Sequence, residues 1–193
     1  MKTLIFATNN INKVKEVRIL LNEKFVIKSL TEAGIHIDIP EPFDTLEKNA
    51  IEKAQVIYNL TGCNCFAEDS GLEVAALHGE PGVKSARYAG EQKSFDDNIN
   101  KLLFKLKNKR NRAAIFKTII CLILNGTQNI FEGTCKGTII AERRGNLGFG
   151  YDSVFIPEGA KKTFAEMPLT EKNIFSHRKI AVEKLIQHLN RLN

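Results

Sequence analysis

Two long β-rich runs that flank the pair Asn125-Gly126 constrain the fold of this 193-residue chain more than any other feature. The first run extends from Arg112 to Leu124 and the second from Asn129 to Ile140. Asn-Gly between two such runs is typical of a tight hairpin turn, because both residues tolerate positive φ angles. The second half of the chain is therefore predicted to contain long antiparallel strands.

The first half of the chain alternates strand patterns with helix patterns. Lys2 to Ala7 reads as a buried strand, and apolar residues recur at helical spacing from Lys13 to about Glu23. Phe25 to Leu30 is predicted as a second strand, and the alternation in Ile35 to Ile39 predicts a third. Together with the hairpin, this order predicts an α/β fold on a mixed sheet with flanking helices.

Three more helices are predicted from their capping signals. Asp44 and Glu47 resemble a capping box, and the helix that they begin is expected to stop at Gly62. Ser94 is expected to cap a helix that ends near Leu106, and Ser176 to cap the last helix. The chain shows neither an internal repeat nor a low-complexity segment, so residues 1–193 are predicted to form a single domain.

Composition and cysteine spacing narrow the class of protein. Apolar residues make up 43% of the chain, which is enough for a buried core. The longest purely apolar run, Ile119 to Leu124, is far shorter than a membrane helix. The four cysteines include no Cys-x-x-Cys pair that would indicate zinc, and we expect them to be reduced and mostly buried. We therefore expect a soluble, cytoplasmic protein with no membrane partner.

One segment alone carries a charge equal to the net charge of the chain, which is +6. Six basic residues and no acidic residue lie between Lys101 and Arg112. Such a segment is compatible with a nucleic-acid footprint or with the solvated end of a helix. Leu102, Leu103 and Leu106 share one helical face within it, which favours the helix end. We therefore expect no nucleic-acid partner.

Adjacent carboxylates occur in the stretch Cys65 to Gly71, where apolar residues run into Glu68 and Asp69 before the turn-prone pair Ser70-Gly71. We predict a strand that ends with these acids at a sheet edge, and a new strand from Leu72. Neighbouring side chains on a strand point to opposite sides, so the two carboxylates are expected to have different tasks. One can meet a cation or polarise a water while the other supports the structure. The alternative is a pair of solvated acids.

The polar turn Thr8-Asn9-Asn10-Ile11-Asn12-Lys13 connects the first predicted strand to the first predicted helix. Asn10 is the expected N-cap. Backbone N–H groups and the positive end of the helix dipole can bind an anion at such a start, and Lys13 adds a full charge one turn in. The alternative is a plain connection between strand and helix. The pattern G-x-x-x-x-G-K-[ST] is absent from the sequence, which argues against an ordinary P-loop kinase or motor.

Glu41 and Lys53 are weaker candidates. Pro40 and Pro42 fix the backbone around Glu41, which makes it a held acid, although an inert loop acid is the alternative. Lys53 lies within a predicted helix but off its apolar stripe. Taken alone, it reads as a surface lysine in a salt bridge.

The segment Gly145 to Phe155 and the start of the last helix carry further candidates. Glycines on both sides of Phe149 let the backbone approach a flat ligand, while Phe149 or Tyr151 offers a ring for stacking. The alternative is a glycine-rich hairpin with core aromatic side chains. His177 and Arg178 stand in the first turn of the last helix, where cations oppose the helix dipole. The unfavourable placement of these two side chains indicates that they serve a purpose outside the helix.

Five motifs, in this order, resemble those of the inosine triphosphate pyrophosphatase family, also called Ham1-like. The resemblance implies Mg²⁺-dependent hydrolysis of the non-standard purine nucleoside triphosphates XTP, ITP and dITP to the monophosphate and pyrophosphate. It also implies an elongated α/β fold with a cleft between two lobes, and a homodimer. The motifs are Thr8-Asn9-Asn10-x-x-Lys13, Glu68-Asp69-Ser70-Gly71-Leu72, Pro81-Gly82-x-x-Ser85-Ala86-Arg87, Gly148-Phe149-Gly150-Tyr151-Asp152 and Ser176-His177-Arg178.

The resemblance assigns roles residue by residue. The turn from Thr8 to Lys13, together with Lys53, would hold the phosphates, and Ser70 would touch the substrate. Asp69 would be the general base and a metal ligand, with Glu41 as the second carboxylate toward Mg²⁺. The purine would be held by Phe149, Gly150, Tyr151, Asp152, Lys172, His177 and Arg178.

The implied chemistry is attack of water on the α-phosphorus, with pyrophosphate as the leaving group. Donors such as His177 or Arg178 match the 6-keto oxygen of hypoxanthine and oppose the 6-amino group of adenine, which would exclude ATP. GTP keeps the 6-keto group, so this pattern does not explain its exclusion. The alternatives are a Maf-like nucleotide pyrophosphatase and a nucleotide-binding or nucleic-acid-binding protein without catalysis.

Overall fold

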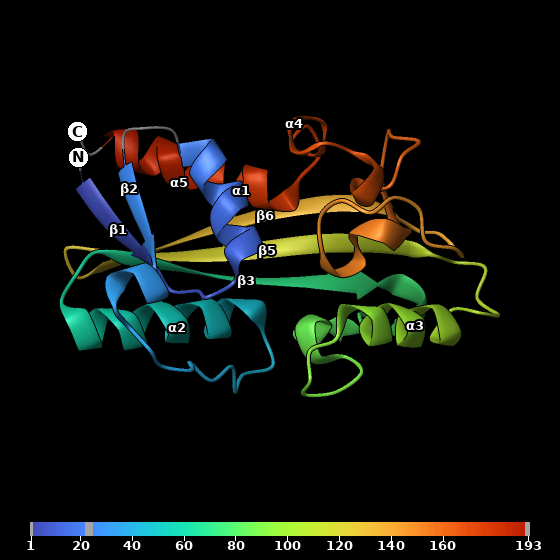
Figure 1. The fold of residues 1–193 in the computed structure, drawn as a ribbon, viewed down its shortest axis with the longest axis horizontal. Helices are drawn as coiled ribbons and strands as arrows, with labels where there is room; N and C mark the ends of the chain where they lie inside the picture. Colours follow the sequence, from blue (N-terminus) through green and yellow to red (C-terminus); the bar gives the residue numbers. More distant parts are fainter. Residues whose placement is uncertain (1, 22–24, 192–193) are drawn as a thin grey trace. The chain divides into compact units, whose positions relative to one another are not determined.

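The computed structural model describes residues 2–21 and 25–191 (Figure 1). The strands of these residues form a mixed sheet in the order β2-β1-β3-β5-β6-β7, with β4 paired to β3, which confirms the predicted α/β fold. The predicted helix end near Glu23 lies outside the described residues. The helices and strands are β1 Lys2–Phe6, α1 Ile11–Leu21, β2 Phe25–Ser29, α2 Leu46–Thr61, β3 Cys65–Val74, β4 Pro81–Gly82, α3 Phe95–Lys105, β5 Ala113–Leu124, β6 Thr127–Ile139, β7 Phe155–Pro157, α4 Leu169–Lys172 and α5 His177–Arg191.

The chain divides into two compact units. The first comprises Met1–Asp69, Thr118–Gly133 and Arg178–Asn193, and the second comprises Ser70–Lys117 and Thr134–His177. Strands β3, β5 and β6 therefore contribute residues to both units. The prediction that residues 1–193 form a single domain stays a prediction.

In the first unit, α1 and α5 cover one face of the strands and α2 covers the other (Figure 1). The core under α1 and α5 includes Phe6 of β1 and Phe66 of β3, whose rings stack at 4.4 Å between centroids. On the other face, Ala54 of α2 is buried and its carbonyl accepts a hydrogen bond from Cys65 Sγ. Successive residues of β3 therefore face different helices, because side chains alternate along a strand.

Capping residues define the ends of the helices in the first unit. Asn10 Oδ1 accepts hydrogen bonds from two backbone N–H groups of the first turn of α1, at 3.0 and 3.2 Å, which confirms Asn10 as its N-cap. The predicted start of α2 is wrong by one residue, because Thr45 and not Asp44 is the N-cap. Gly62 ends α2 with a φ of 66°, as predicted.

The third predicted strand, Ile35 to Ile39, is wrong, because this segment is irregular. It follows a short 3-10 helix that Gly34 ends with a φ of 72°. Within the segment Ile35 alone is buried, so the alternating residues do not pack on a sheet. An alternating pattern yields a strand only where a neighbouring strand takes its hydrogen bonds, and Pro40 directly after the segment offers no N–H.

The prediction that the strand ends at Asp69 is wrong. Strand β3 continues through Ser70 and Gly71 to Val74. In the sheet order β3 lies between β1 and β5, so it is an inner strand and not an edge. Sheet pairing overrides the local turn preference of Ser70-Gly71 here. Asp69 therefore lies inside a continuous strand, between the residues that pair with β1, Cys65 and Phe66, and those that pair with β4, Leu72 and Glu73.

The predicted hairpin is confirmed. β5 and β6 are joined by Asn125 and Gly126, whose φ angles are 50° and 81°. Positive φ at both central residues is the signature of a type I′ turn, which matches the twist of the flanking strands. In the second unit, Ser94 Oγ accepts a hydrogen bond from the N–H of Asp97 and caps α3, as predicted.

The second unit has its own aromatic core. Phe116 of β5 packs edge-on against Phe155 of β7, with ring centroids 4.6 Å apart. Phe164, in a 3-10 helix of residues Phe164–Glu166, packs against both rings at 6.1 and 5.3 Å. All three rings belong to the buried core of the second unit.

Half of the basic segment 101–112 serves the fold. Lys101 donates to the carbonyl of Tyr88, and Lys105 pairs with Glu80. The guanidinium of Arg112 donates to three backbone carbonyls, those of Leu106, Ile139 and Ile140. The two lysines therefore join α3 to the segment of residues 80–88, and Arg112 joins the residue after α3 to the end of β6.

The cysteines are free, as expected. Cys65, Cys121 and Cys135 are buried, and burial raises the pKa of each thiol to about 12. Cys63 is exposed. Across residues 2–21 and 25–191, every helix is too short or too polar to span a bilayer.

Candidate active site

Glu68 and Asp69 follow one another in β3 and face opposite helix layers, as the strand geometry predicts. Glu68 contacts Lys13 of α1 and Arg178 of α5. Asp69 contacts Lys53 of α2. All of these residues belong to the first unit. The two neighbouring carboxylates therefore enter separate clusters of charge.

The first cluster consists of Lys53, Glu41 and Asp69. Lys53 Nζ lies 2.7 Å from Glu41 Oε1 and 2.9 Å from Asp69 Oδ1. The interpretation of Lys53 as a surface residue is wrong, because its side chain is only 8% exposed. A buried ammonium is tolerated where carboxylates compensate its charge, and here two do so.

Burial and the neighbouring charges shift the pKa values of Lys53 and Asp69. Burial opposes the charged form of Lys53, but Asp69 and Glu41 outweigh it and raise the pKa of the ammonium. Burial also raises the pKa of Asp69, and the nearby Glu41 adds to this, while Lys53 and Lys13 act in the opposite direction. Asp69 is therefore a stronger base than an ordinary aspartate, which suits a group that takes a proton from water.

The second oxygen of Asp69 is the feature that points to a ligand. Oδ2 is buried, and no group of the described residues makes a hydrogen bond to it. Buried carboxylate oxygens are rarely left this way without an ion or a water. The described residues contain no cluster of three or more His, Cys, Asp or Glu side chains that could hold a metal. Mg²⁺ commonly uses one or two carboxylates and completes its shell with water and phosphate oxygens, so Asp69 and Glu41 fit this ion.

The predicted phosphate turn lies at the start of α1. Thr8 and Asn10 are partly exposed, and Asn9, Ile11 and Asn12 are exposed. Lys13 is 17% exposed and its Nζ lies 3.2 Å from Glu68 Oε1. Lys13 also acts on the pKa of Asp69, so its charge is felt on both sides of β3. The predicted phosphate-binding residue Lys13 and the predicted base Asp69 thus lie in one unit, where the charge of Lys13 acts on Asp69.

Part of the predicted anion site needs correction. The sequence predicts free backbone N–H groups that could bind a phosphate. In the structure, the backbone N–H groups of Asn12 and Lys13 instead donate to the Asn10 side chain. The N–H of Asn10 donates to Thr8 Oγ1 at 3.1 Å. Because the helix caps itself, its dipole and the Lys13 charge remain as the anion-attracting groups.

The second cluster consists of Glu68, Arg178 and Glu16. Arg178 donates from Nε and Nη2 to both oxygens of Glu68, at 2.8 and 2.7 Å, and from Nη1 to Glu16. Burial opposes the charge of Arg178, but Glu68 and Glu16 outweigh it and raise its pKa. Arg178 is therefore permanently charged and lies with the phosphate-side residues of the first unit.

The residues assigned to the purine gather in the second unit, apart from Arg178. Asp152 Oδ2 accepts hydrogen bonds from Lys172 Nζ at 2.7 Å and from the backbone N–H of Phe149 at 3.0 Å. Lys172 Nζ also lies 5.4 Å from the centre of the Phe149 ring, within range of a cation–π contact. Asp152 and Lys172 thus fix the loop that carries Phe149.

The structure decides which aromatic side chain of this loop is accessible. Tyr151 is buried and its OH donates to the carbonyl of Ser85 at 2.9 Å, so it is a core residue. Phe149 is partly exposed and can offer its ring. Gly150 between them has a φ of 60°, which turns the chain so that the two rings have different surroundings.

His177 and Ser70 complete the predicted set. The His177 imidazole stacks on Phe116 with an interplanar angle of 7° and ring centroids 4.7 Å apart. Both residues belong to the second unit. Ser70 follows Asp69 directly in β3 and is partly exposed. The ring plane of His177 is therefore set by an aromatic residue of β5.

Glu16 and Phe116 are the site residues that sequence reasoning missed. Glu16 lies three residues after Lys13 and therefore on nearly the same face of α1. It also lies between the buried residues Val14 and Val17, and an acid at such a position of the helix is a signal that the sequence offers. Phe116 lies within a continuous apolar run of β5, so no local pattern distinguishes it from other core residues. Its role depends on a residue 61 positions later, His177.

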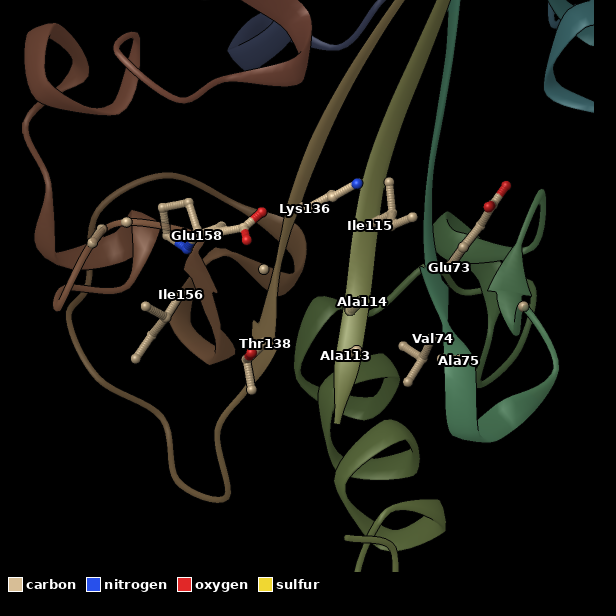
Figure 2. Close-up of a pocket in the computed structure, with 15 residues that line it drawn as sticks. Glu73, Val74, Ala75, Ala113, Ala114, Ile115, Lys136, Thr138, Ile156 and Glu158 are labelled. Atoms are coloured by element: carbon tan, nitrogen blue, oxygen red, sulfur yellow. The ribbon is translucent and has the colours of Figure 1, made fainter. Parts of the chain in front are cut away.

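A cavity of about 640 Å³ in the second unit is separate from all of these residues. Figure 2 shows the side chains of Glu73, Ile115 and Lys136 extending from β3, β5 and β6 around it. None of the residues assigned to phosphate, metal or purine lines this cavity. The chemistry indicated by the charge clusters therefore does not coincide with it.

Comparison with known proteins identifies the relatives of this chain. Residues 4–188 match the model of the Ham1 family. The chain is 54% identical to a dITP/XTP pyrophosphatase of Flavobacterium johnsoniae, covering 96% of this chain and 97% of the relative. It is 43% identical to a dITP/XTP pyrophosphatase of Bacillus subtilis, covering 96% of each.

Solved structures give the same result for the fold. The Ham1 protein of Staphylococcus aureus superposes with a TM-score of 0.90 at 36% identity, over 100% of both chains. A nucleoside-triphosphatase, dITP/XTP pyrophosphatase, of Mycobacterium abscessus superposes with a TM-score of 0.77 at 35% identity, over 95% of this chain and 98% of the other. The likeness extends over the whole chain and not over a single motif.

Proposed function

The chain belongs to the Ham1 family, and we propose that it is a nucleoside-triphosphate pyrophosphohydrolase acting on non-standard purine nucleotides such as dITP and XTP. Its relatives in Flavobacterium and Bacillus carry the name dITP/XTP pyrophosphatase and match it over nearly their whole length. Among the structural observations, the one that carries most weight is Asp69, a buried acid with raised pKa that pairs with Lys53 through Oδ1 and whose Oδ2 receives no hydrogen bond from the described residues.

Asp69 is proposed as the general base. A water molecule attacks the α-phosphorus, and the bond from phosphorus to the bridging oxygen of the pyrophosphate group breaks as the new bond forms. The proton of the water passes to Asp69 Oδ2, which is the oxygen without a hydrogen bond from the described residues. The raised pKa of Asp69 supports this role, because it narrows the gap between the base and water.

Lys13 and Lys53 are proposed to hold the phosphates, together with the positive end of the α1 dipole and the turn from Thr8 to Asn12. Negative charge develops on the departing pyrophosphate, and fixed positive charges lower its energy. Lys13 is suited to this because Glu68 holds its Nζ at 3.2 Å while the side chain remains partly exposed.

Mg²⁺ is proposed as the cofactor, with Asp69 and Glu41 as its protein ligands. When bound, Mg²⁺ would neutralise phosphate charge and acidify the attacking water. The support is the donor chemistry of the two carboxylates, whose oxygen atoms Glu41 Oε1 and Asp69 Oδ1 both lie within 2.9 Å of Lys53 Nζ and therefore close to one point. The residues of this chain would orient the ion, while substrate oxygens and water supply the remaining ligands.

Selectivity for the base is proposed to come from Phe149, the backbone of residues 150–152, and the donors of Lys172 and His177, which all belong to the second unit. A purine with a 6-keto oxygen accepts hydrogen bonds from such donors, whereas the 6-amino group of adenine sets donor against donor. Each unpaired buried polar group costs ~1 to 3 kcal/mol, so two mismatches can reject ATP by several hundredfold. Ser70 is proposed as an additional substrate contact.

We further propose that the enzyme works as a homodimer in the cytoplasm, where the nucleotide pool resides. These two properties follow from the resemblance to the family. Light scattering coupled to size-exclusion chromatography tests the first, with a mass of twice 21.7 kDa expected and a monomer mass speaking against it.

Product analysis tests the proposed activity. The purified chain is incubated with ITP, XTP, dITP, GTP, ATP and a modified pyrimidine triphosphate, with and without Mg²⁺, and products are separated by anion-exchange chromatography. Binding of nucleotides and of an oligonucleotide is measured in parallel at low and high salt. We expect pyrophosphate and monophosphate from the first three only, and only with Mg²⁺. Preference for modified pyrimidines would indicate a Maf-like enzyme. Nucleotide binding without product would indicate a sensor, and salt-sensitive oligonucleotide binding without product would indicate a nucleic-acid binder.

A further inference from the structure

Lys53 occupies the position that a cation would take between the two carboxylates. Its Nζ lies 2.7 Å from Glu41 Oε1 and 2.9 Å from Asp69 Oδ1, so one nitrogen bridges both acids. Its side chain is 8% exposed, against 25% for Glu41 and 7% for Asp69. The ammonium is therefore held in place by both acids and is largely screened from water.

The charge balance of this cluster explains why the lysine stands there. Two carboxylates side by side repel one another, and in a site of low polarity one would take up a proton unless a cation lies between them. Lys53 supplies this cation, and its own pKa is raised by the same two acids. The oxygens that it engages, Glu41 Oε1 and Asp69 Oδ1, are ligand atoms that a divalent ion would need.

We propose that Lys53 competes with the metal ion for the two carboxylates. When the ion binds, the Lys53 ammonium leaves the carboxylates and only then becomes available to the phosphates. This inference rests on the proposed metal and phosphate roles of Glu41, Asp69 and Lys53. A divalent ion on the same two oxygen atoms would lie close to the Lys53 ammonium and repel it, so binding of one cation opposes binding of the other. Metal binding and phosphate binding are therefore coupled through one side chain.

Metal affinity without nucleotide provides the first test. Mg²⁺ binding to the whole chain is measured by isothermal titration calorimetry for wild type and Lys53→Met, which keeps the aliphatic stem and removes the charge. We expect Lys53→Met to bind Mg²⁺ more tightly, on the order of tenfold. Lys48→Met is the matched control, because Lys48 lies on the same helix and is 62% exposed. Its affinity should equal that of wild type.

Two outcomes of this titration overturn the proposal. Equal or weaker Mg²⁺ binding by Lys53→Met contradicts competition, as does failure of both proteins to bind Mg²⁺. Thermal unfolding checks that the variant is folded, and Lys53→Gln, which retains a hydrogen-bond donor, replaces it if it is not. These measurements involve no hydrolysis. Absence of pyrophosphate release by wild type would therefore refute the proposed function without deciding this point.

A second measurement uses the wild-type chain alone. Crystals grown without metal and crystals soaked in Mg²⁺ are compared at Lys53 Nζ. We expect Nζ to leave hydrogen-bonding distance of at least one carboxylate in the soaked crystals. A bound ion with both contacts of Lys53 intact would contradict the exchange.

A third measurement tests the coupling to phosphate binding, with inorganic tripolyphosphate as the probe. The affinity for tripolyphosphate should rise less on adding Mg²⁺ in Lys53→Met than in wild type. An equal rise would contradict coupling through Lys53.

Discussion

The ammonium of Lys172 lies 2.7 Å from Oδ2 of Asp152, and both side chains are almost fully buried, at 4% and 6% exposure. The same Oδ2 accepts a hydrogen bond from the backbone N–H of Phe149. One carboxylate oxygen therefore fixes a charged side chain and the backbone of the loop next to it. The stability of the protein and the proposed recognition of the base are therefore expected to depend on this atom.

Asp152→Ala is expected to destabilise the protein strongly. It leaves the buried Lys172 ammonium without this carboxylate, and breaking a buried ion pair from one side costs ~3 to 5 kcal/mol. Urea unfolding followed by circular dichroism measures the change. Lys162→Met, which removes the exposed pair with Glu171, is the control and should cost less than ~1 kcal/mol. Similar losses for both variants would contradict the burial argument.

Gly148→Ala is expected to impair the same loop by a steric route. A Cβ atom at Gly148 would overlap Asp152 Oδ2, and the φ of 74° is strained for alanine. Gly150→Ala is the matched control, because its φ is 60° and no atom lies within 4 Å of the added Cβ. Both variants share the backbone strain of about 1 kcal/mol, whereas only Gly148→Ala displaces Asp152. We expect a higher KM for ITP in Gly148→Ala than in Gly150→Ala, and equal values would refute the contact.

Asp69→Asn is expected to abolish turnover of ITP while nucleotide binding is largely retained. The amide keeps the shape of the side chain but cannot take a proton, and loss of a general base costs ~100-fold or more. Single-turnover kinetics and calorimetric binding of ITP measure the two properties separately. Asp38→Asn, an exposed acid on the irregular segment, serves as the control. A rate close to that of wild type would remove Asp69 from the mechanism.

The pH dependence of kcat/KM should report Asp69. Catalysis needs the ionised carboxylate, and burial raises its pKa, so activity should fall with decreasing pH at higher pH than for an ordinary aspartate. Lys13 lowers this pKa, so Lys13→Met should move the acidic limb to still higher pH. Lys15→Met, an exposed neighbour on α1, should leave the limb in place. A limb that moves to lower pH in Lys13→Met would contradict the sign.

Local chemistry predicted several elements correctly. The Asn125-Gly126 turn and the Asn10 cap are determined by the conformations and hydrogen bonds that these residues themselves allow, so the sequence contains the full signal. The opposite orientations of Glu68 and Asp69 follow from the period of a strand in the same way. Such features need no knowledge of distant residues.

Features that depend on distant partners could not be predicted. Ser70-Gly71 favours a turn, but β3 continues through both residues as part of a sheet whose other strands are distant in the sequence. Lys53 reads as exposed until Glu41 and Asp69, 12 positions before it and 16 after it, are seen to compensate its charge. Ile35 to Ile39 shows the opposite error, since a strand pattern without a partner strand remains irregular.

The unequal burial of the four thiols provides an internal probe for the experiments above. Cys63 is exposed, whereas Cys65, Cys121 and Cys135 are buried with pKa values raised to about 12. Thiolates are the reactive form of cysteine. A chromogenic disulfide reagent should therefore modify Cys63 rapidly in the native protein, and the three buried thiols only when the protein unfolds locally or globally. Counting modified groups over time would then show whether a substitution loosens the interior, without any added label.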